Sequence, residues 1–192
     1  MADKPSILGR LSAVRGAQAV ARFGKEAFGE TQEDGKDGLS QARVGDLVRV
    51  KTPASMVYGI VNSLTISEFD NKGIPQSGLM EMDLIGEILI ATDTPTAGFQ
   101  RGISIAPALG AAVMAASEDD AGSVYAVPTK AHIKVGKIHQ SDNITAHLLI
   151  DDLLNKHFAI LGTTGSGKSC AVTLFLHAIL NACSHGHIIM LD

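Results

Sequence analysis

The stretch HFAILGTTGSGKSC, at residues 157–170, constrains the fold of this chain more than any other. Its residues 162–169, GTTGSGKS, complete the pattern G-x-x-x-x-G-K-[ST]. Glycine adopts backbone angles that are closed to other residues, so successive N–H groups of such a loop can turn inward and surround phosphate oxygens. A continuous apolar run precedes the pattern and the largely apolar segment KSCAVTLFLHAILNAC follows it. We therefore expect the loop to connect a buried strand to a helix.

This spacing predicts a nucleotide-binding loop, with ATP and Mg²⁺ as cofactors. The positive end of the following helix favours phosphate, and Lys168 can reach the β- and γ-phosphates, so we expect Lys168 to be the catalytic residue. The hydroxyl of Ser169 can join the coordination of Mg²⁺ and is the predicted metal ligand. The predicted nucleotide-binding residues are Gly162, Thr163, Thr164, Gly165, Ser166, Gly167, Lys168, Ser169 and Cys170.

The C-terminal segment predicts the order strand, loop, helix, strand, which is one βαβ unit of a parallel sheet. Its second strand is HIIML, followed by Asp192. An acid after an apolar run resembles a magnesium-holding motif, but that motif usually follows a later strand, so we expect a lesser polar role for Asp192. One helix cannot cover both faces of such a sheet, so we expect the chain to be truncated. A partner that completes the fold is the alternative.

The chain before residue 150 predicts short strands and no convincing helix. Residues 7–23 predict two strands joined by a turn, and further strands are expected in the segments 46–52, 55–67 and 79–90, in RGISIAPALGAAVMAAS and in VYAVPT. Within RGISIAPALGAAVMAAS, PALGAAVMAA can alternatively be helical, because alanine favours helix. Residues 24–46 are charged and glycine-rich, which predicts a mobile surface loop. Five or more short strands separated by turns indicate a small barrel or sandwich.

Evenly spaced acids mark the segment LMEMDLIGEILI at residues 79–90. Glu81, Asp83 and Glu87 are spaced as on one face of a strand, and Gly86 favours a bulge or tight bend. We therefore expect one polar face with a local irregularity near its end.

Composition excludes several classes of protein. With 192 residues, of which 45% are hydrophobic, the chain can bury a substantial core. The net charge of −4 gives no overall basic field, which argues against a module that reads DNA sequence. Two cysteines are too few for a disulfide framework, and no apolar run approaches the roughly 18 residues of a membrane span. We expect a cytoplasmic protein without a membrane partner.

Two further groups of residues have plain structural interpretations. Cys183, His185 and His187 match no common zinc spacing, so we expect no metal centre there. The scattered cations of the N-terminal region are expected to be solvated, with a DNA-contacting stripe as the alternative; they are Arg10, Arg15, Arg22, Arg43, Arg49 and Lys51.

The quoted stretches resemble the HerA-type ATPases of the HerA–FtsK superfamily. HFAILGTTGSGKS is similar to the family's strand and P-loop, and HIIMLD to its following strand. GRLSAVRGAQAVARF, VGDLVRVKT, VYGIVNSL and PALGAAVMAAS resemble its N-terminal β-barrel. Cys170 departs from the pattern, because a second Ser or Thr is common there. The resemblance covers nearly the whole chain and is most specific at the P-loop.

The resemblance implies a β + α/β fold: a small N-terminal β-barrel at residues 1–145, then the opening βαβ unit of a RecA-like P-loop ATPase domain at residues 146–192. It further implies a hexameric homo-oligomer that translocates or unwinds double-stranded DNA. A nuclease or an antiphage effector, such as a sirtuin-like protein, would dock on the barrel. The later acidic motif and arginine finger are expected beyond Asp192, so this piece alone is expected to be inactive. The alternative is a nucleotide-gated scaffold that does not pump DNA.

Overall fold

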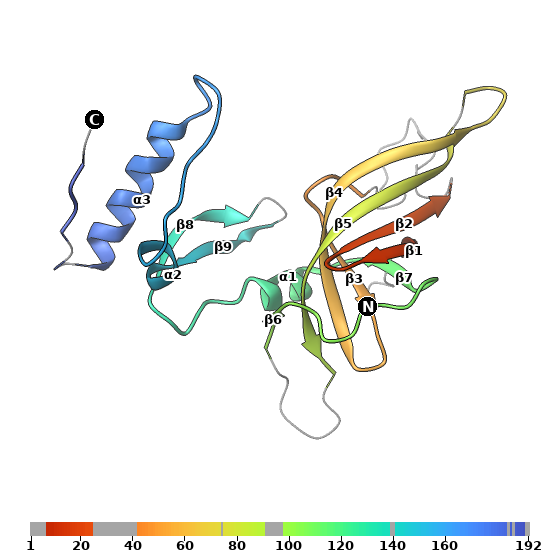
Figure 1. Cartoon of the computed structure of the whole chain (residues 1–192), viewed down its shortest axis with the longest axis horizontal. Helices are drawn as coiled ribbons and strands as arrows, with labels where there is room; N and C mark the ends of the chain where they lie inside the picture. Colours follow the sequence, from red (N-terminus) through yellow and green to blue (C-terminus); the bar gives the residue numbers. More distant parts are fainter. Residues whose placement is uncertain are drawn as a thin grey trace. The chain divides into compact units, whose positions relative to one another are not determined.

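The chain folds into two compact units, Met1–Val124 and Tyr125–Asp192 (Figure 1). The computed structural model describes residues 7–24, 42–73, 75–90, 98–138, 141–183, 185 and 187–190. The elements of the first unit are β1 (Ile7–Arg15), β2 (Gln18–Gly24), β3 (Leu47–Lys51), β4 (Ser55–Phe69), β5 (Pro75–Leu89), β6 (Gln100–Arg101), β7 (Ala112–Ala115) and α1 (Glu118–Val124). Those of the second unit are β8 (His132–Ile138), β9 (Ser141–Leu149), α2 (Ile150–Leu154) and α3 (Lys168–Ala182).

Six strands of the first unit close into an antiparallel barrel. Their order is β2-β1-β7-β3-β4-β5. The whole of β2 pairs with β5, which completes the ring. The short β6 pairs with β5 outside this ring. Closure gives each of the six strands a neighbour on both sides, which a sandwich does not do for its edge strands. Of the two architectures expected from the sequence, the barrel is confirmed.

Alternation of side chains along the strands fills the barrel. In β2, Ala19, Ala21 and Phe23 point into the core, and in the paired strand β5 the inward residues are Met80 and Met82. The remaining buried core residues are Leu8, Leu11, Val48, Val50, Val57, Val61, Leu84 and Val113. Small side chains on β2 face methionines on β5, and methionine adapts well to irregular space, so the narrow interior is filled.

The irregularity predicted near Gly86 is present, and it changes which acids are exposed. Gly86 pairs with Tyr58 while the next residue of β4 pairs with Leu84, so one extra residue forms a β-bulge. The extra residue reverses the inward and outward alternation. Glu81 therefore lies outside but Glu87 is 2% exposed, and the expectation of a single polar face is wrong for Glu87.

The buried carboxylate of Glu87 is held by hydrogen bonds at both oxygens. The backbone N–H of Ser104 donates to Oε1 over 2.7 Å, and the Ser55 hydroxyl donates to Oε2 over 2.7 Å. The hydrogen bonds from Ser104 and Ser55 lower the pKa of Glu87, outweighing burial, which raises it. The Glu87 carboxylate thus links Ser104, which follows β6, to Ser55 at the start of β4.

We expect Glu87→Gln to lower the free energy of barrel unfolding by about 2 kcal/mol at pH 7, since hydrogen bonds to a charged group are stronger than those to an amide. Because the folded pKa of Glu87 is depressed, its contribution is present above the unfolded value near 4.3 and is lost as the pH falls through the folded value. Urea unfolding at pH 7 and at about pH 3 checks this. An equal loss at both pH values would contradict it.

The short helix α1 forms the end of the first unit. The expectation of no helix before about residue 150 is therefore wrong. Ser117 and Asp120 form a reciprocal N-terminal cap: the N–H of Asp120 donates to Ser117 Oγ, and the N–H of Ser117 donates to Asp120 Oδ2. This is the capping box, with an aspartate in its acidic position, and the letters SEDD at residues 117–120 contain the signal for it.

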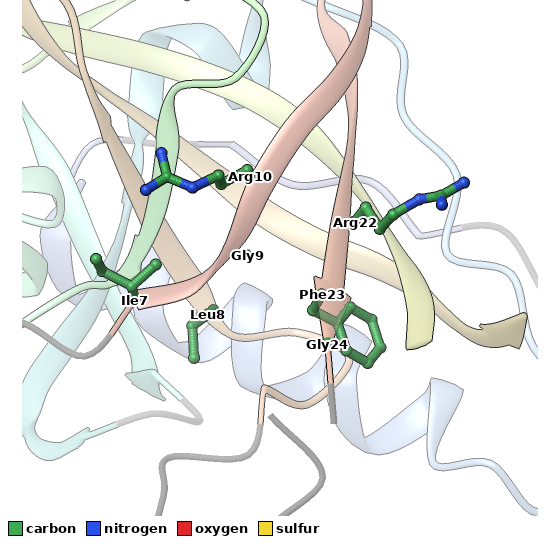
Figure 2. A pocket seen from close by; sticks show the side chains of 7 residues that line it. All are labelled: Ile7, Leu8, Gly9, Arg10, Arg22, Phe23 and Gly24. Carbon is green, nitrogen blue, oxygen red and sulfur yellow. The ribbon is translucent and has the colours of Figure 1, made fainter. Parts of the chain in front are cut away.

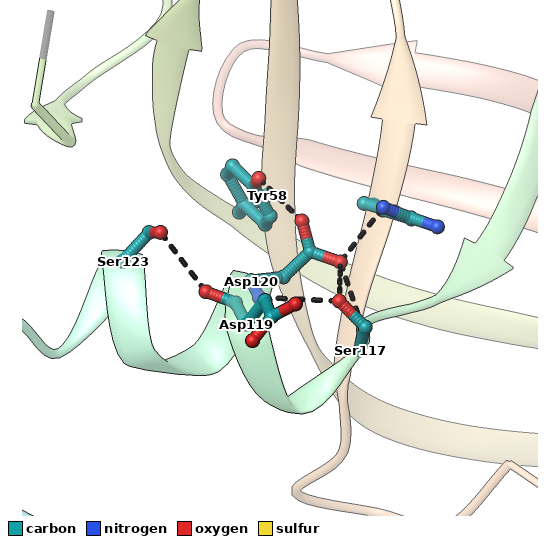
Figure 3. Close-up of polar contacts among 6 residues, drawn as sticks. Tyr58, Ser117, Asp119, Asp120 and Ser123 are labelled. Carbon is teal, nitrogen blue, oxygen red and sulfur yellow. Dashed lines mark hydrogen bonds and ion pairs between the residues drawn. The ribbon is translucent and has the colours of Figure 1, made fainter. Parts of the chain in front are cut away.

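The side chain of Asp120 also fastens α1 to the barrel wall (Figure 3). Its Oδ2 lies 2.8 Å from Arg49 Nη1, and Tyr58 donates its hydroxyl proton to Oδ1 over 2.8 Å. Burial raises the pKa of Asp120, but hydrogen bonds from Ser117 and Tyr58 and the Arg49 charge hold it below its ordinary value. Burial, together with Asp120, raises the pKa of Tyr58. We call this group of Arg49, Tyr58, Ser117 and Asp120 the Asp120 clamp.

The other strand predictions before residue 150 have mixed outcomes. The hairpin expected at residues 7–23 is confirmed, and PALGAAVMAAS contains strand β7 rather than a helix. VYAVPT is wrong as a strand, because α1 ends at Val124 and the following residues pair with no strand among the described residues. Of the predicted loop 24–46, Gly24 ends β2, residues 25–41 lie outside the described residues, and 42–46 lead into β3.

The second unit consists of the β8–β9 hairpin, the short helix α2 and the helix α3. Ile133, Ile150 and Ile179 form its buried cluster, with Phe175 and Leu148 packed against it. The hairpin therefore packs on α3. None of the helices in the described ranges is long and apolar enough to cross a membrane.

Candidate nucleotide-binding site

The glycine-rich loop leads directly into α3, as its spacing predicts. Gly167 is the N-cap of α3 with φ 86° and ψ 15°, and Gly165 has φ 80°. These left-handed angles are strained for residues with a Cβ, so both positions require glycine for the turn that aims the loop's N–H groups. No side chain caps the start of α3, where Gly167 provides only backbone. The first N–H groups of the helix are thus left for another acceptor, such as a phosphate.

Lys168 folds back over the loop that precedes it. Its Nζ donates a hydrogen bond of 2.6 Å to the carbonyl oxygen of Thr163, and Ser166 N–H donates to the same oxygen over 3.2 Å. Lys168 is partly buried, while its neighbours from Leu161 to Gly167 are exposed. The ammonium group therefore lies over a turn of backbone that it can leave for a stronger acceptor.

Gly162 lies in contact with the far side of the same turn. A Cβ at this position would lie 2.5 Å from Ser166 Oγ and 3.4 Å from Lys168 Cγ. A side chain at Gly162 would therefore require the Ser166 hydroxyl to rotate away.

Ser169 and Cys170 occupy the first turn of α3, and both are exposed. Cys170 is a free thiol. One turn later, Thr173 donates its hydroxyl to the Ser169 carbonyl over 2.9 Å, a local bond that sequence reasoning missed. Its only sequence signal is a threonine four residues after Ser169 inside a helix. The structure therefore brings residues 162–170 together as one loop and helix start.

The strands predicted on either side of the loop are not formed in the described structure. Residues 157–162 and 187–190 belong to no strand of the described structure, although they are rich in apolar side chains. Leu161 is 88% exposed and Ile189 is 87% exposed. A strand is defined by its ladder, and these two segments do not pair with each other, which is the physical reason for the difference. Asp192 lies outside the described residues.

Two other polar groups of the second unit lie outside residues 162–170. Among residues with a described placement, no three or more His, Cys, Asp or Glu side chains gather as metal ligands, so Cys183, His185 and His187 form no such group. Asp151 and Asp152 lie in the first turn of α2, and Asp152 lies 4.0 Å from Lys156 in an exposed ion pair. These acids stabilise a helix terminus.

The closed barrel is followed in the chain by strand and helix elements and by a glycine-rich loop at the start of α3. Residues 133–192 match the family model described as helicase HerA, central domain. Together with the barrel, this match is consistent with a HerA-type ATPase, and the family resemblance seen in the sequence is confirmed. No curated protein matches the chain.

Proposed function

We propose that this chain is part of an ATP-driven motor that translocates or unwinds double-stranded DNA. The single observation that carries the proposal is the loop at residues 162–169, closed by the Lys168 to Thr163 hydrogen bond at the start of α3, within a segment that matches the HerA central domain. Phosphate is the ligand that exposed N–H groups, a helix N-terminus and a lysine recognise together. Gly165 and Gly167 fit a phosphate-binding loop, because their left-handed backbone angles are strained for any residue with a Cβ.

In this proposal, the backbone N–H groups of residues 163–168 hold the phosphates and Lys168 transfers its hydrogen bond from Thr163 to a phosphate oxygen. Ser169 would hold Mg²⁺, which when bound neutralises charge on the phosphates. The positive charge of Lys168 then stabilises negative charge that develops at the transferred group.

The proposal includes a homo-oligomeric ring, of six subunits by resemblance, and a cytoplasmic location. The barrel would dock a nuclease or an antiphage effector.

One observation on the barrel favours the second candidate function, a nucleotide-gated scaffold that does not pump DNA. Arg49 is one of the six cations considered for a DNA stripe, but it is paired to Asp120 in the clamp and is only 21% exposed at its side chain. The barrel thus offers fewer free cations to DNA than the sequence suggests.

Steady-state ATP hydrolysis by the intact native polypeptide, with and without long double-stranded DNA, tests the motor. We expect DNA to raise the rate about tenfold or more, as transition-state groups are completed only in the engaged ring. Short duplexes that are too small to support translocation serve as the matched control. Turnover that is indifferent to DNA length and presence would reject the motor in favour of the scaffold.

A further inference from the structure

The barrel wall opens at one seam, where β1 and β2 separate. The ladder between these strands begins at Arg10↔Arg22 and continues toward the hairpin turn. Before Arg10, β1 pairs with β7, and a register shift between Ile7 and Gly9 marks a bulge. On the other side of the seam, Phe23 and Gly24 pair with β5. The start of β1 therefore pairs with β7 and the end of β2 pairs with β5, and a groove lies between these two strand ends.

The groove is a cavity of about 340 Å³, lined by residues 7–10 and 22–24 (Figure 2). Its apolar lining combines Leu8 and Phe23, which are 5% and 7% exposed, with Ile7, which is 57% exposed. At the inner end, a Cβ on Gly9 would lie 2.7 Å from the Arg22 carbonyl oxygen, so the strands still touch there. The cavity is thus a short slot that is closed at one end and has the size of a small ligand pocket.

Two arginines flank the slot. Arg10 and Arg22 lie directly opposite each other on the ladder, and Figure 2 shows their side chains directed to opposite sides of the groove. Both are exposed, and neither is paired with a carboxylate in the described part of the chain. Arg10 Nη1 donates one hydrogen bond, to the Gly110 carbonyl over 3.0 Å, which leaves its other N–H donors for a ligand.

We propose that this seam groove docks a segment of a partner protein in which a large apolar side chain is flanked by carboxylates. The apolar side chain enters the slot over Leu8 and Phe23, and the carboxylates accept hydrogen bonds from Arg10 and Arg22. The inference deepens the part of the proposed function in which the barrel docks a protein, and it does not depend on the nucleotide site.

An acidic peptide fits the groove better than a DNA backbone. Both would satisfy the arginines, but the exposed Ile7 and the slot lined by Leu8 and Phe23 offer apolar surface that phosphates and sugars do not use. A peptide supplies an apolar anchor and charge from one short segment. Binding of duplex DNA at this seam is therefore the competing outcome of the test.

Fluorescence anisotropy with two labelled probes tests the proposal on the whole chain: the peptide Gly-Glu-Glu-Phe-Glu-Glu-Gly and a duplex oligonucleotide. The test variant is Arg10→Glu with Arg22→Glu, and the matched control is Arg15→Glu with Arg101→Glu, which reverses two exposed charges outside the groove. We expect the test variant to weaken peptide binding about tenfold or more and the control to change it less than about twofold. Replacing the phenylalanine of the peptide by alanine should cost a similar factor.

A second variant, Ile7→Asp, guards against a folding defect, because the side chain of Ile7 is largely exposed and its loss should leave the barrel intact. Ile7→Asp should also weaken binding of the peptide. Absence of peptide binding, equal binding by test and control variants, or binding of the duplex but not the peptide would each overturn the proposal. Lys168→Ala, which changes a residue of the other compact unit, should remove ATP hydrolysis by the intact polypeptide and leave peptide binding unchanged, so a failure of the groove is distinguishable from a failure of the motor.

Discussion

Lys168→Ala is expected to lower ATP turnover by the intact polypeptide at least about 100-fold. The side chain of Lys168 is the cation that the loop brings to the phosphates, and removing one such preorganised donor typically has an effect of this size. In the free protein, the same change removes only a hydrogen bond to the Thr163 carbonyl on an exposed loop, so the fold should remain. Steady-state phosphate release measures the first effect, and circular dichroism melting measures the second.

Lys156→Ala is the matched control, because Lys156 is an exposed lysine in the same unit whose ion pair with Asp152 is long, at 4.0 Å. Surface pairs of this kind contribute little, so turnover should stay within about twofold of wild type. If the Lys168→Ala protein hydrolyses ATP at a near wild-type rate, the assignment of the nucleotide site to residues 162–169 is wrong.

Asp120→Ala is expected to lower the free energy of barrel unfolding by about 2 to 3 kcal/mol. The change leaves Arg49 without its partner at 21% side-chain exposure, and the Nε of Arg49 is already buried without a hydrogen-bond partner in the described structure. It also removes the acceptor of the Tyr58 hydroxyl and the reciprocal cap of α1. Urea unfolding followed by circular dichroism gives the difference.

Two further variants separate the parts of the clamp. Tyr58→Phe deletes one hydrogen bond and should cost about 1 kcal/mol. Arg49→Met combined with Asp120→Ala removes both charges, so it should be more stable than Asp120→Ala alone. If the double variant is less stable than Asp120→Ala, the loss does not come from the unpaired arginine.

The barrel could be predicted because its strands carry their own signals. Alternating apolar residues in β2 and turn glycines between strands point to a β-domain, and the structure confirms one. Closure could not be predicted, since the pairing of Gln18 with Asp83 joins residues far apart in the chain. Glu87 misled the prediction because a single extra residue at the bulge reverses the two faces, and spacing alone does not reveal where a bulge falls.

The loop at residues 162–169 could be predicted almost completely, because its glycine spacing is imposed by backbone geometry within a few residues. The angles at Gly165 and Gly167 follow from that spacing. The flanking strands could not be predicted correctly, because an apolar run becomes a strand only when another strand pairs with it. The Asp120 clamp joins α1 to β3 and β4, and no local pattern indicates the partners Arg49 and Tyr58.

Hydrogen exchange of the intact native polypeptide, with and without a non-hydrolysable ATP analogue and Mg²⁺, tests the nucleotide site most directly. We predict that saturating nucleotide slows exchange of the amides at residues 163–170, because phosphate oxygens accept hydrogen bonds from them, while exchange in the barrel strands is unchanged. Saturation that leaves exchange in this loop unaltered, or protection confined to another region, would contradict the assignment of the site.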